Sequence, residues 1–250
     1  AAFVERMNRR AEELGMTDTH FVNCTGLDDG ADAGEHLTTA YDIALMSREL
    51  LRHEEIKQYT TIWMDTVRNG TFGLSNTNKL VRFYDGTTGL KTGFTSGAGY
   101  CLSASAERGG MELIAVVMHC DTSPHRFESA KALFNYGFSN FALVQPAPEE
   151  EIPAVPVTLG REEAIVPVLR ETQPLLIDKA KAASVQTAVT VDESVTAPVE
   201  KGQQLGLLRV TAGDETIAEL PLVAPERVEA LTWWDVMVRT LRAMCMMCME

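Results

Sequence analysis

A proline- and glutamate-rich stretch near the middle of the sequence separates two parts of different character. Residues 144–157, VQPAPEEEIPAVPV, hold four prolines and three consecutive glutamates. Proline fixes its φ angle and lacks a backbone N–H, so helices and central strands do not continue through such a stretch. The sequence therefore predicts a first domain over residues 1–143 and a small β-rich domain over 144–225, with a linker over 144–156.

The first part combines helices with an antiparallel sheet. The spacing of apolar residues predicts a helix in AAFVERMNRRAEELGM, and HLTTAYDIALMSRELLRH predicts a second helix with Thr39 and Asp42 as a capping box. From Gly89 onward, GLKTGFT predicts a strand, and YCLSASA and MELIAVVM predict a hairpin. A helix over residues 124–141 is expected to cover this sheet. These features indicate an α+β fold.

The second part lacks such helices until its end. Short apolar segments separated by Gly, Asp and Lys pairs predict an all-β region over residues 150–224. Residues 226–250 predict an amphipathic helix, with Leu231, Trp234 and Val238 on one face. On the residues alone, this helix packs on the β-rich domain or lies in a membrane interface, and both alternatives remain open.

Charge and cysteine content exclude several classes of function. The 250 residues are 45% hydrophobic, as in a folded protein, and carry a net charge of −13 with no basic run, so we expect no nucleic-acid partner. Five cysteines, an odd number, do not indicate a disulfide framework. The pair Cys245 and Cys248, and the group His119, Cys120, Asp121 and His125, have potential metal-ligand spacing, but we favour thiols in an apolar tail and polar loop residues. We expect no metal and no cofactor.

The segment GLKTGFTSGAGY, residues 89–100, contains the most informative polar cluster. Lys91 lies on a predicted strand that opens a hairpin, and Thr92 and Thr95 flank it. The surrounding glycines let a ligand lie close to the backbone. An ammonium group, two hydroxyls and a backbone N–H on a strand edge suit a carboxylate and a developing oxyanion. The residues therefore predict a pocket for a carboxylate next to a carbonyl group.

This segment resembles the Lys-Thr-Gly box of penicillin-binding proteins and serine β-lactamases, and its longer form K-T-G-x-T-x-x-A-G-Y is similar to the carboxypeptidase branch. THFVNCTGLDD, HLTTAYDIALMSRELL and HRFESAKALFNYGF resemble other parts of that family. The resemblance covers residues 1 to about 143 and, more loosely, the β-rich domain. It implies a partial penicillin-binding/β-lactamase-like catalytic domain and serine-type D-Ala-D-Ala carboxypeptidase activity, which trims peptidoglycan pentapeptides without a cofactor. A β-lactamase is disfavoured because that class has no need of the appended domain.

The resemblance also implies roles for individual residues. It makes Lys91, Thr92 and Gly93 catalytic: Lys91 supports proton transfer, and Thr92 hydrogen-bonds the substrate carboxylate. Phe94 and Thr95 bind substrate, Thr95 through its hydroxyl and Phe94 through a backbone N–H of the oxyanion hole.

A further substrate-binding residue implied by the resemblance is Arg126, whose guanidinium suits the planar carboxylate. The alternative is a surface arginine that pairs with Glu128 or solvent.

The serine chemistry of this family is not encoded in these 250 residues. None of the ten serines has a lysine three positions later, and neither Ser-x-Asn nor Tyr-x-Asn occurs. We therefore expect a fragment whose serine motifs precede Ala1, as the uncapped first helix suggests, and we expect no acylation of this chain. The alternative is a non-catalytic relative that binds cell-wall peptide.

The implied partners follow from this assignment. They are a stem peptide ending in D-Ala-D-Ala, β-lactam antibiotics for the complete protein, and a membrane surface contacted by residues 226–250. The implied location is the extracytoplasmic face of the bacterial cell membrane.

Overall fold

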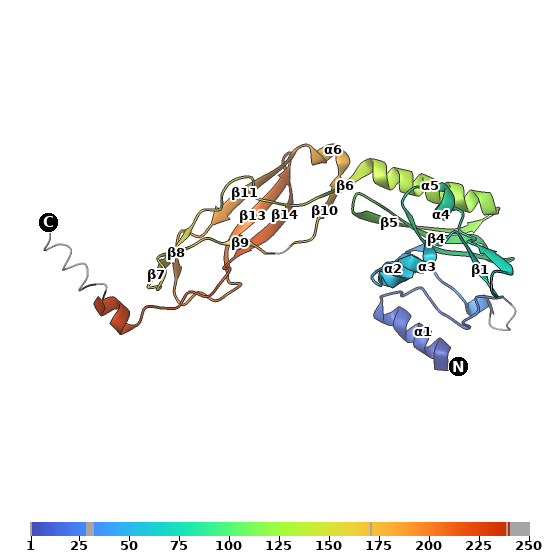
Figure 1. The fold of residues 1–250 in the computed structure, drawn as a ribbon, viewed down its shortest axis with the longest axis horizontal. Coiled ribbons are helices and arrows are strands. Elements are labelled where there is room, and N and C mark those ends of the chain that lie inside the picture. The colour runs from blue at the N-terminus through green and yellow to red at the C-terminus, as the bar shows by residue number, and fades with distance from the viewer. Residues whose placement is uncertain (1, 29–32, 171, 239, 241–250) are drawn as a thin grey trace. The chain divides into compact units, whose positions relative to one another are not determined.

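The computed structural model describes residues 2–28, 33–170, 172–238 and 240. It forms two compact units, the first ending at Asn140 and the second beginning at Phe141 (Figure 1). The α+β fold class expected from the sequence is confirmed.

An antiparallel three-stranded sheet forms the centre of the first unit. Its strands are β3 (Thr87–Thr95), β4 (Gly99–Arg108) and β5 (Met111–Cys120), in the order β3-β4-β5. In this register Lys91 faces Ser103 and Gly93 faces Cys101. The predicted strand and hairpin are therefore present, and the Lys-Thr-Gly box lies on an edge strand.

Helices cover the two faces of this sheet (Figure 1). Helix α5 (Ser123–Asn140) packs on the face that carries Leu102 and Ala104, and its Phe134 is buried among them. Helix α2 (Ala40–Leu51) lies on the other face, where the hydroxyls of Ser47 and Ser103 are 2.7 Å apart. Because side chains alternate along a strand, the face toward α2 is also the face that carries Lys91.

The start of α2 differs from the expected capping box in one respect. The Thr39 hydroxyl accepts the Asp42 N–H at 3.1 Å, as expected. The Asp42 carboxylate, 2% exposed, instead accepts the Asp18 N–H at 3.0 Å and the Thr19 hydroxyl at 2.6 Å. The carboxylate therefore ties α2 to the preceding loop, because that loop offers it two donors.

The remaining elements of the first unit surround the sheet. The first helix is present as α1, and a hairpin of two exposed strands, β1 and β2, precedes the sheet. The bounds are α1 Ala2–Glu13, the 3₁₀ helix η1 Ala33–Glu35, α3 Glu55–Thr60, β1 Met64–Val67, β2 Phe72–Ser75 and α4 Leu80–Phe83.

Among its described residues, the second unit is built mostly of strands, with the short helix α6 and a helical segment over residues 233–238. The strand orders are β11-β13-β14-β9, β12-β7-β8 and β10-β6. A buried apolar cluster of this unit includes Val155, Val199 and Leu205. The bounds are β6 Phe141–Val144, β7 Val155–Thr158, β8 Ala164–Ile165, β9 Val168–Leu169, β10 Leu175–Asp178, α6 Lys179–Ala182, β11 Val185–Val191, β12 Val195–Thr196, β13 Gln204–Ala212 and β14 Glu215–Val223. Because β6 pairs with β10, the second unit begins at Phe141, before the proline-rich stretch.

The expected C-terminal helix starts later than residue 226. Val228 is 1% exposed and bridges Val199, so this part of the chain completes the β-rich core. Helix is present over residues 233–238, so the prediction of helix over 226–232 was wrong. Other residues of the expected helix lie outside the described residues, namely Arg239, Leu241, Arg242, Cys245 and Cys248. Within the described ranges, no helix is long and apolar enough to cross a bilayer.

Candidate active site

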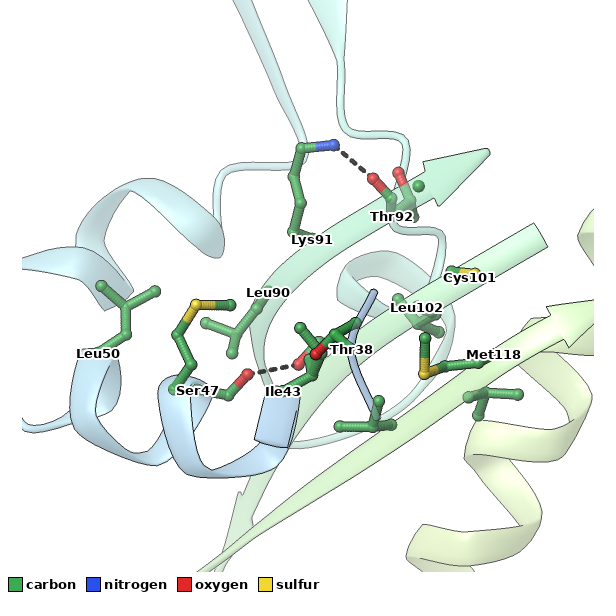
Figure 2. A pocket seen from close by; sticks show the side chains of 15 residues that line it. Thr38, Ile43, Ser47, Leu50, Leu90, Lys91, Thr92, Cys101, Leu102 and Met118 are labelled. Atoms are coloured by element: carbon green, nitrogen blue, oxygen red, sulfur yellow. Dashed lines mark hydrogen bonds between the residues drawn. The ribbon is translucent and has the colours of Figure 1, made fainter. Parts of the chain in front are cut away.

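The Lys-Thr-Gly box lies at the end of an edge strand, with its cation exposed. Figure 2 shows the Lys91 ammonium beside Thr92, and Lys91 Nζ donates a hydrogen bond to the Thr92 carbonyl oxygen. Lys91 and Gly93 are exposed, whereas Thr92 is only 7% exposed. The side of the strand that carries Lys91 is therefore the accessible side.

The contact with Lys91 also shows which backbone groups are free to bind a ligand. A carbonyl that accepts from Lys91 points away from β4, so Thr92 turns its backbone toward the open edge of β3. Backbone direction alternates with a period of two in an antiparallel ladder, so the Phe94 N–H faces the same open edge. The carbonyls of Gly93 and Cys101, a facing pair, are both reached by one nitrogen of Arg126, which agrees with this alternation. A backbone donor therefore faces the same open edge toward which the Lys91 ammonium group reaches.

Side chains around Phe94 hold this part of the strand in place. Phe94 is 56% exposed, and its ring lies 4.3 Å from the Tyr100 ring, centroid to centroid. The Thr95 hydroxyl accepts the Ala98 N–H at 2.9 Å, which closes the turn between β3 and β4. Accepting that bond uses a lone pair and leaves the hydroxyl proton to donate. Thr95 therefore has a donor for a ligand while it shapes the turn.

Arg126 is buried beneath the strand ends, so the alternative of a surface arginine was wrong. It is 7% exposed, and its Nη1 donates to the carbonyls of Gly93 at 3.0 Å and Cys101 at 3.3 Å. The guanidinium also lies 5.4 Å from the centroid of the Tyr100 ring. Burial lowers the pKa of Arg126 from its ordinary value, but an arginine remains charged in proteins. Its charge and its donors therefore act on the strand that carries the box.

An apolar hollow of about 460 Å³ adjoins Lys91 on the sheet face toward α2 (Figure 2). Met46 and Leu50 from α2, and Leu90 and Met118 from the sheet, line it together with Lys91. The ammonium group thus lies at the border of an apolar surface, where desolvation strengthens its attraction for an anion.

The sequence analysis missed two residues that contact this strand, Thr77 and Asn78, and the asparagine before them. The Thr77 hydroxyl lies 2.7 Å from the Thr92 hydroxyl, and Asn78 Nδ2 donates to the Gly89 carbonyl at 2.9 Å. Asn76 donates to the Thr60 carbonyl at 3.2 Å and accepts the Asn78 N–H at 2.9 Å. The polar triplet Asn-Thr-Asn before an apolar helix was the available signal, but nothing local indicated its partner strand.

The group around His119 has a contact that involves no metal. His119 Nδ1 lies 3.2 Å from the Ala98 carbonyl oxygen, at the turn between β3 and β4. Among the described residues, no three His, Cys, Asp or Glu side chains are placed to hold a metal ion.

Comparison with known proteins finds a matching family model for each of the two units. Residues 1–122 match the family model of D-alanyl-D-alanine carboxypeptidase, and residues 142–230 match that of the penicillin-binding protein 5 C-terminal domain. The chain therefore belongs to the D-alanyl-D-alanine carboxypeptidase family of penicillin-binding proteins, and the resemblance read from the sequence is confirmed.

Individual relatives extend over most of the chain. It is 35% identical over 245 residues to D-alanyl-D-alanine carboxypeptidase DacF of Bacillus subtilis, covering 96% of this chain and 62% of the relative. The structure of penicillin-binding protein 5 from Haemophilus influenzae is similar with a TM-score of 0.70 at 29% identity, over 91% of this chain and 66% of that chain. Penicillin-binding protein D2 of Listeria monocytogenes with bound cefotaxime is similar with a TM-score of 0.50 at 38% identity, over 54% of this chain and 55% of that chain. The chain thus spans less than two thirds of these proteins' lengths.

Proposed function

We propose that this chain supplies the carboxylate-binding side of a serine-type D-Ala-D-Ala carboxypeptidase, which removes the terminal D-Ala from peptidoglycan pentapeptides. One arrangement carries the proposal: the exposed Lys91 ammonium group bonds a carbonyl at the open edge of β3, and the Phe94 N–H faces that same edge. A peptide ending in D-Ala-D-Ala presents a carboxylate one residue away from the carbonyl that is attacked. The ammonium group matches the carboxylate, and the N–H matches the negative charge that develops on the oxygen of the attacked carbonyl.

Each residue of the site has a part in this proposal. Lys91 attracts the terminal carboxylate and supports proton transfer, and the hydroxyls of Thr92 and Thr95 hydrogen-bond that carboxylate. Gly93 leaves room for the substrate, and the Phe94 N–H stabilises the oxyanion. These five residues are consecutive, so one strand places all of them.

Arg126 contributes to the same site from beneath the strand. Its guanidinium is bonded to the carbonyls of Gly93 and Cys101, and its charge adds to the field that a carboxylate experiences at the strand end. Arg126 is thus proposed to contribute to substrate binding through its charge and through its hydrogen bonds to the two backbone carbonyls.

The chain by itself is proposed to bind but not to acylate, because its sequence contains no Ser-x-x-Lys. Incubation with labelled penicillin should leave its intact mass unchanged, whereas Listeria penicillin-binding protein D2 serves as the positive control. An NMR titration with diacetyl-L-Lys-D-Ala-D-Ala should shift the amide signals of residues 91–95, and the same peptide with a C-terminal amide should shift them less. A stoichiometric penicillin adduct would refute this part of the proposal.

Reading the coding sequence upstream of Ala1 tests the remaining part of the proposal, the carboxypeptidase activity of the longer protein. A Ser-x-x-Lys followed by Ser-x-Asn there would support the carboxypeptidase. A native start codon at that point would leave the alternative, a penicillin-binding-protein-like module that binds wall peptide without catalysis.

The proposed location is the extracytoplasmic face of the bacterial membrane, where the wall peptide is found. Trp233 and Trp234 support a membrane contact, because they are 71% and 65% exposed at the start of the last described helix. Tryptophan is enriched at membrane–water interfaces. Binding of β-lactam antibiotics is proposed for the complete protein, as in the cefotaxime-bound relative.

A further inference from the structure

Thr77 extends the hydroxyl group of Thr92 toward solvent. The two side-chain oxygens are 2.7 Å apart, and either can donate. Thr92 is 7% exposed, whereas Thr77 is exposed. The hydroxyl pair therefore joins a buried residue of β3 to an exposed neighbour, and a ligand from solvent reaches Thr77 before Thr92.

The neighbours of Thr77 fix its position. Asn78, 1% exposed, donates to the Gly89 carbonyl at 2.9 Å and accepts the Leu80 N–H at 3.1 Å. Asn76 accepts the Asn78 N–H at 2.9 Å and donates to the Ile62 carbonyl at 3.0 Å. Thr77 is thus held between two anchored asparagines, one of which bonds β3 itself. The Thr77 hydroxyl is preorganised beside the strand.

The chemistry of a carboxylate sets the direction of the hydroxyl pair. A carboxylate only accepts hydrogen bonds, so the hydroxyl that meets it must donate. If Thr77 donates outward, its oxygen is free to accept the proton of Thr92. The bond from Thr77 to the charged carboxylate is then the stronger of the two. The bond from Thr92 to Thr77 polarises the Thr77 hydroxyl and so strengthens the first bond.

We propose that Thr77 is a substrate-binding residue of this site, which donates to the terminal carboxylate of the peptide with Thr92 bonded behind it as a relay. This inference rests on the proposed function and adds a contact outside the Lys-Thr-Gly box. It makes the contribution of Thr92 to carboxylate binding an indirect one, through Thr77. It predicts that Thr77 helps the site to distinguish a peptide acid from the corresponding amide.

The test uses this chain and the NMR titration with diacetyl-L-Lys-D-Ala-D-Ala and its C-terminal amide. Thr77→Val keeps the shape but removes the hydroxyl, so affinity for the acid should fall by roughly tenfold or more and affinity for the amide should change much less. Thr77→Ser keeps the hydroxyl and should bind within about twofold of the wild type. The matched control is Thr216→Val, at an exposed threonine of β14, which should leave binding unchanged.

A double-mutant cycle with Thr92→Val separates a relay from two independent contacts. In a relay, the double variant should lose little more affinity than Thr77→Val alone, because the outer bond is already gone. Losses that add, with each hydroxyl acting separately, would contradict the relay. Thermal unfolding of each variant verifies that the fold is retained.

The outcomes separate this inference from the proposed function. A wild type that prefers the acid, with a Thr77→Val variant that does not, supports both. A Thr77→Val variant with the wild-type preference overturns the role of Thr77 and leaves the carboxylate site at Lys91. Equal binding of acid and amide by the wild type overturns the carboxylate site, and the role of Thr77 with it.

Discussion

Arg126 shows how one buried side chain joins the strands of the site. Its Nη1 donates to carbonyls on both β3 and β4, and Nη2 donates to the Ser123 hydroxyl at 3.2 Å. Within the described residues, Nε is buried without a hydrogen-bond partner. The arginine therefore joins the strand pair through Nη1, while Nη2 bonds the start of its own helix. Burial opposes the charge of Arg126 and lowers its pKa.

Replacing Arg126 with methionine should destabilise the first unit. The carbonyls of Gly93 and Cys101 would lose a charged donor, at a cost of about 1–3 kcal/mol in the free energy of unfolding. Urea unfolding followed by NMR signals of β4 measures this. The exposed Arg82 offers the control, since Arg82→Met should change stability by less than about 0.5 kcal/mol. Equal effects of both substitutions would contradict the role given to Arg126.

At the scale of elements, helix α2 depends on two polar residues at its start. Thr39 caps the helix in the way that the sequence predicts, because a cap involves residues only three apart. The partners of Asp42 lie 23 and 24 residues away, in a loop that local reasoning does not place. The buried carboxylate thus belongs to the packing of the helix rather than to its cap.

Alanine substitutions should separate these two contributions. Thr39→Ala should cost about 1 kcal/mol, the usual value of a helix cap. Asp42→Ala should cost about 2–3 kcal/mol, because it leaves the Asp18 N–H and the Thr19 hydroxyl without their buried acceptor. Chemical unfolding of both variants gives the comparison. A larger cost for Thr39→Ala would show that the loop contact is not the stronger anchor.

The last described helix has a complete capping box that was missed. The Asp235 carboxylate accepts from the Thr232 N–H at 2.8 Å and from its hydroxyl at 2.7 Å, while Thr232 accepts the Asp235 N–H at 3.3 Å. The spacing T-x-x-D was visible in the sequence. It marks the helix start at residue 233, which the apolar periodicity alone had placed at 226.

This cap predicts a pH dependence. Hydrogen bonds from Thr232, together with Arg161, lower the pKa of Asp235 below its ordinary value of 3.8. A carboxylate with a lowered pKa stabilises the folded state at neutral pH, and this contribution is lost as the pH falls through the folded pKa. The Thr232 amide signal should therefore shift upon acidification below about pH 4. Asp235→Asn should abolish that shift, and an unchanged shift in the variant would contradict the assignment.

At the scale of the whole molecule, the two units differ in how they are built. The first places helices on both faces of one sheet, and the second is built mostly of strands. The exposed tryptophans belong to the second unit, which is where we propose a membrane contact. Such a contact depends on apolar burial, since the chain carries a net charge of −13.

Cosedimentation with neutral phosphatidylcholine vesicles tests this membrane contact. Burying half of a tryptophan, about 100 Å², is worth about 2–3 kcal/mol, so Trp233→Ala with Trp234→Ala should reduce binding by more than roughly tenfold. The control is Val166→Ala with Leu176→Ala, two exposed apolar residues of the same unit, which should have little effect. Equal loss in both double variants would show that the tryptophans are not the anchor.

The sequence by itself determined the fold class, the strand and hairpin around Lys91, and the family. These depend on local patterns: periodicity, turn residues and a ten-residue segment in which the functional groups are consecutive. Only the tertiary structure decided that Arg126 is buried, that the Phe94 N–H faces an open edge and that Thr77 meets Thr92. The Thr77–Thr92 contact joins residues 15 apart and the Arg126–Gly93 contact residues 33 apart. Such contacts arise from the way helices and loops pack against the sheet, and no local pattern encodes that packing.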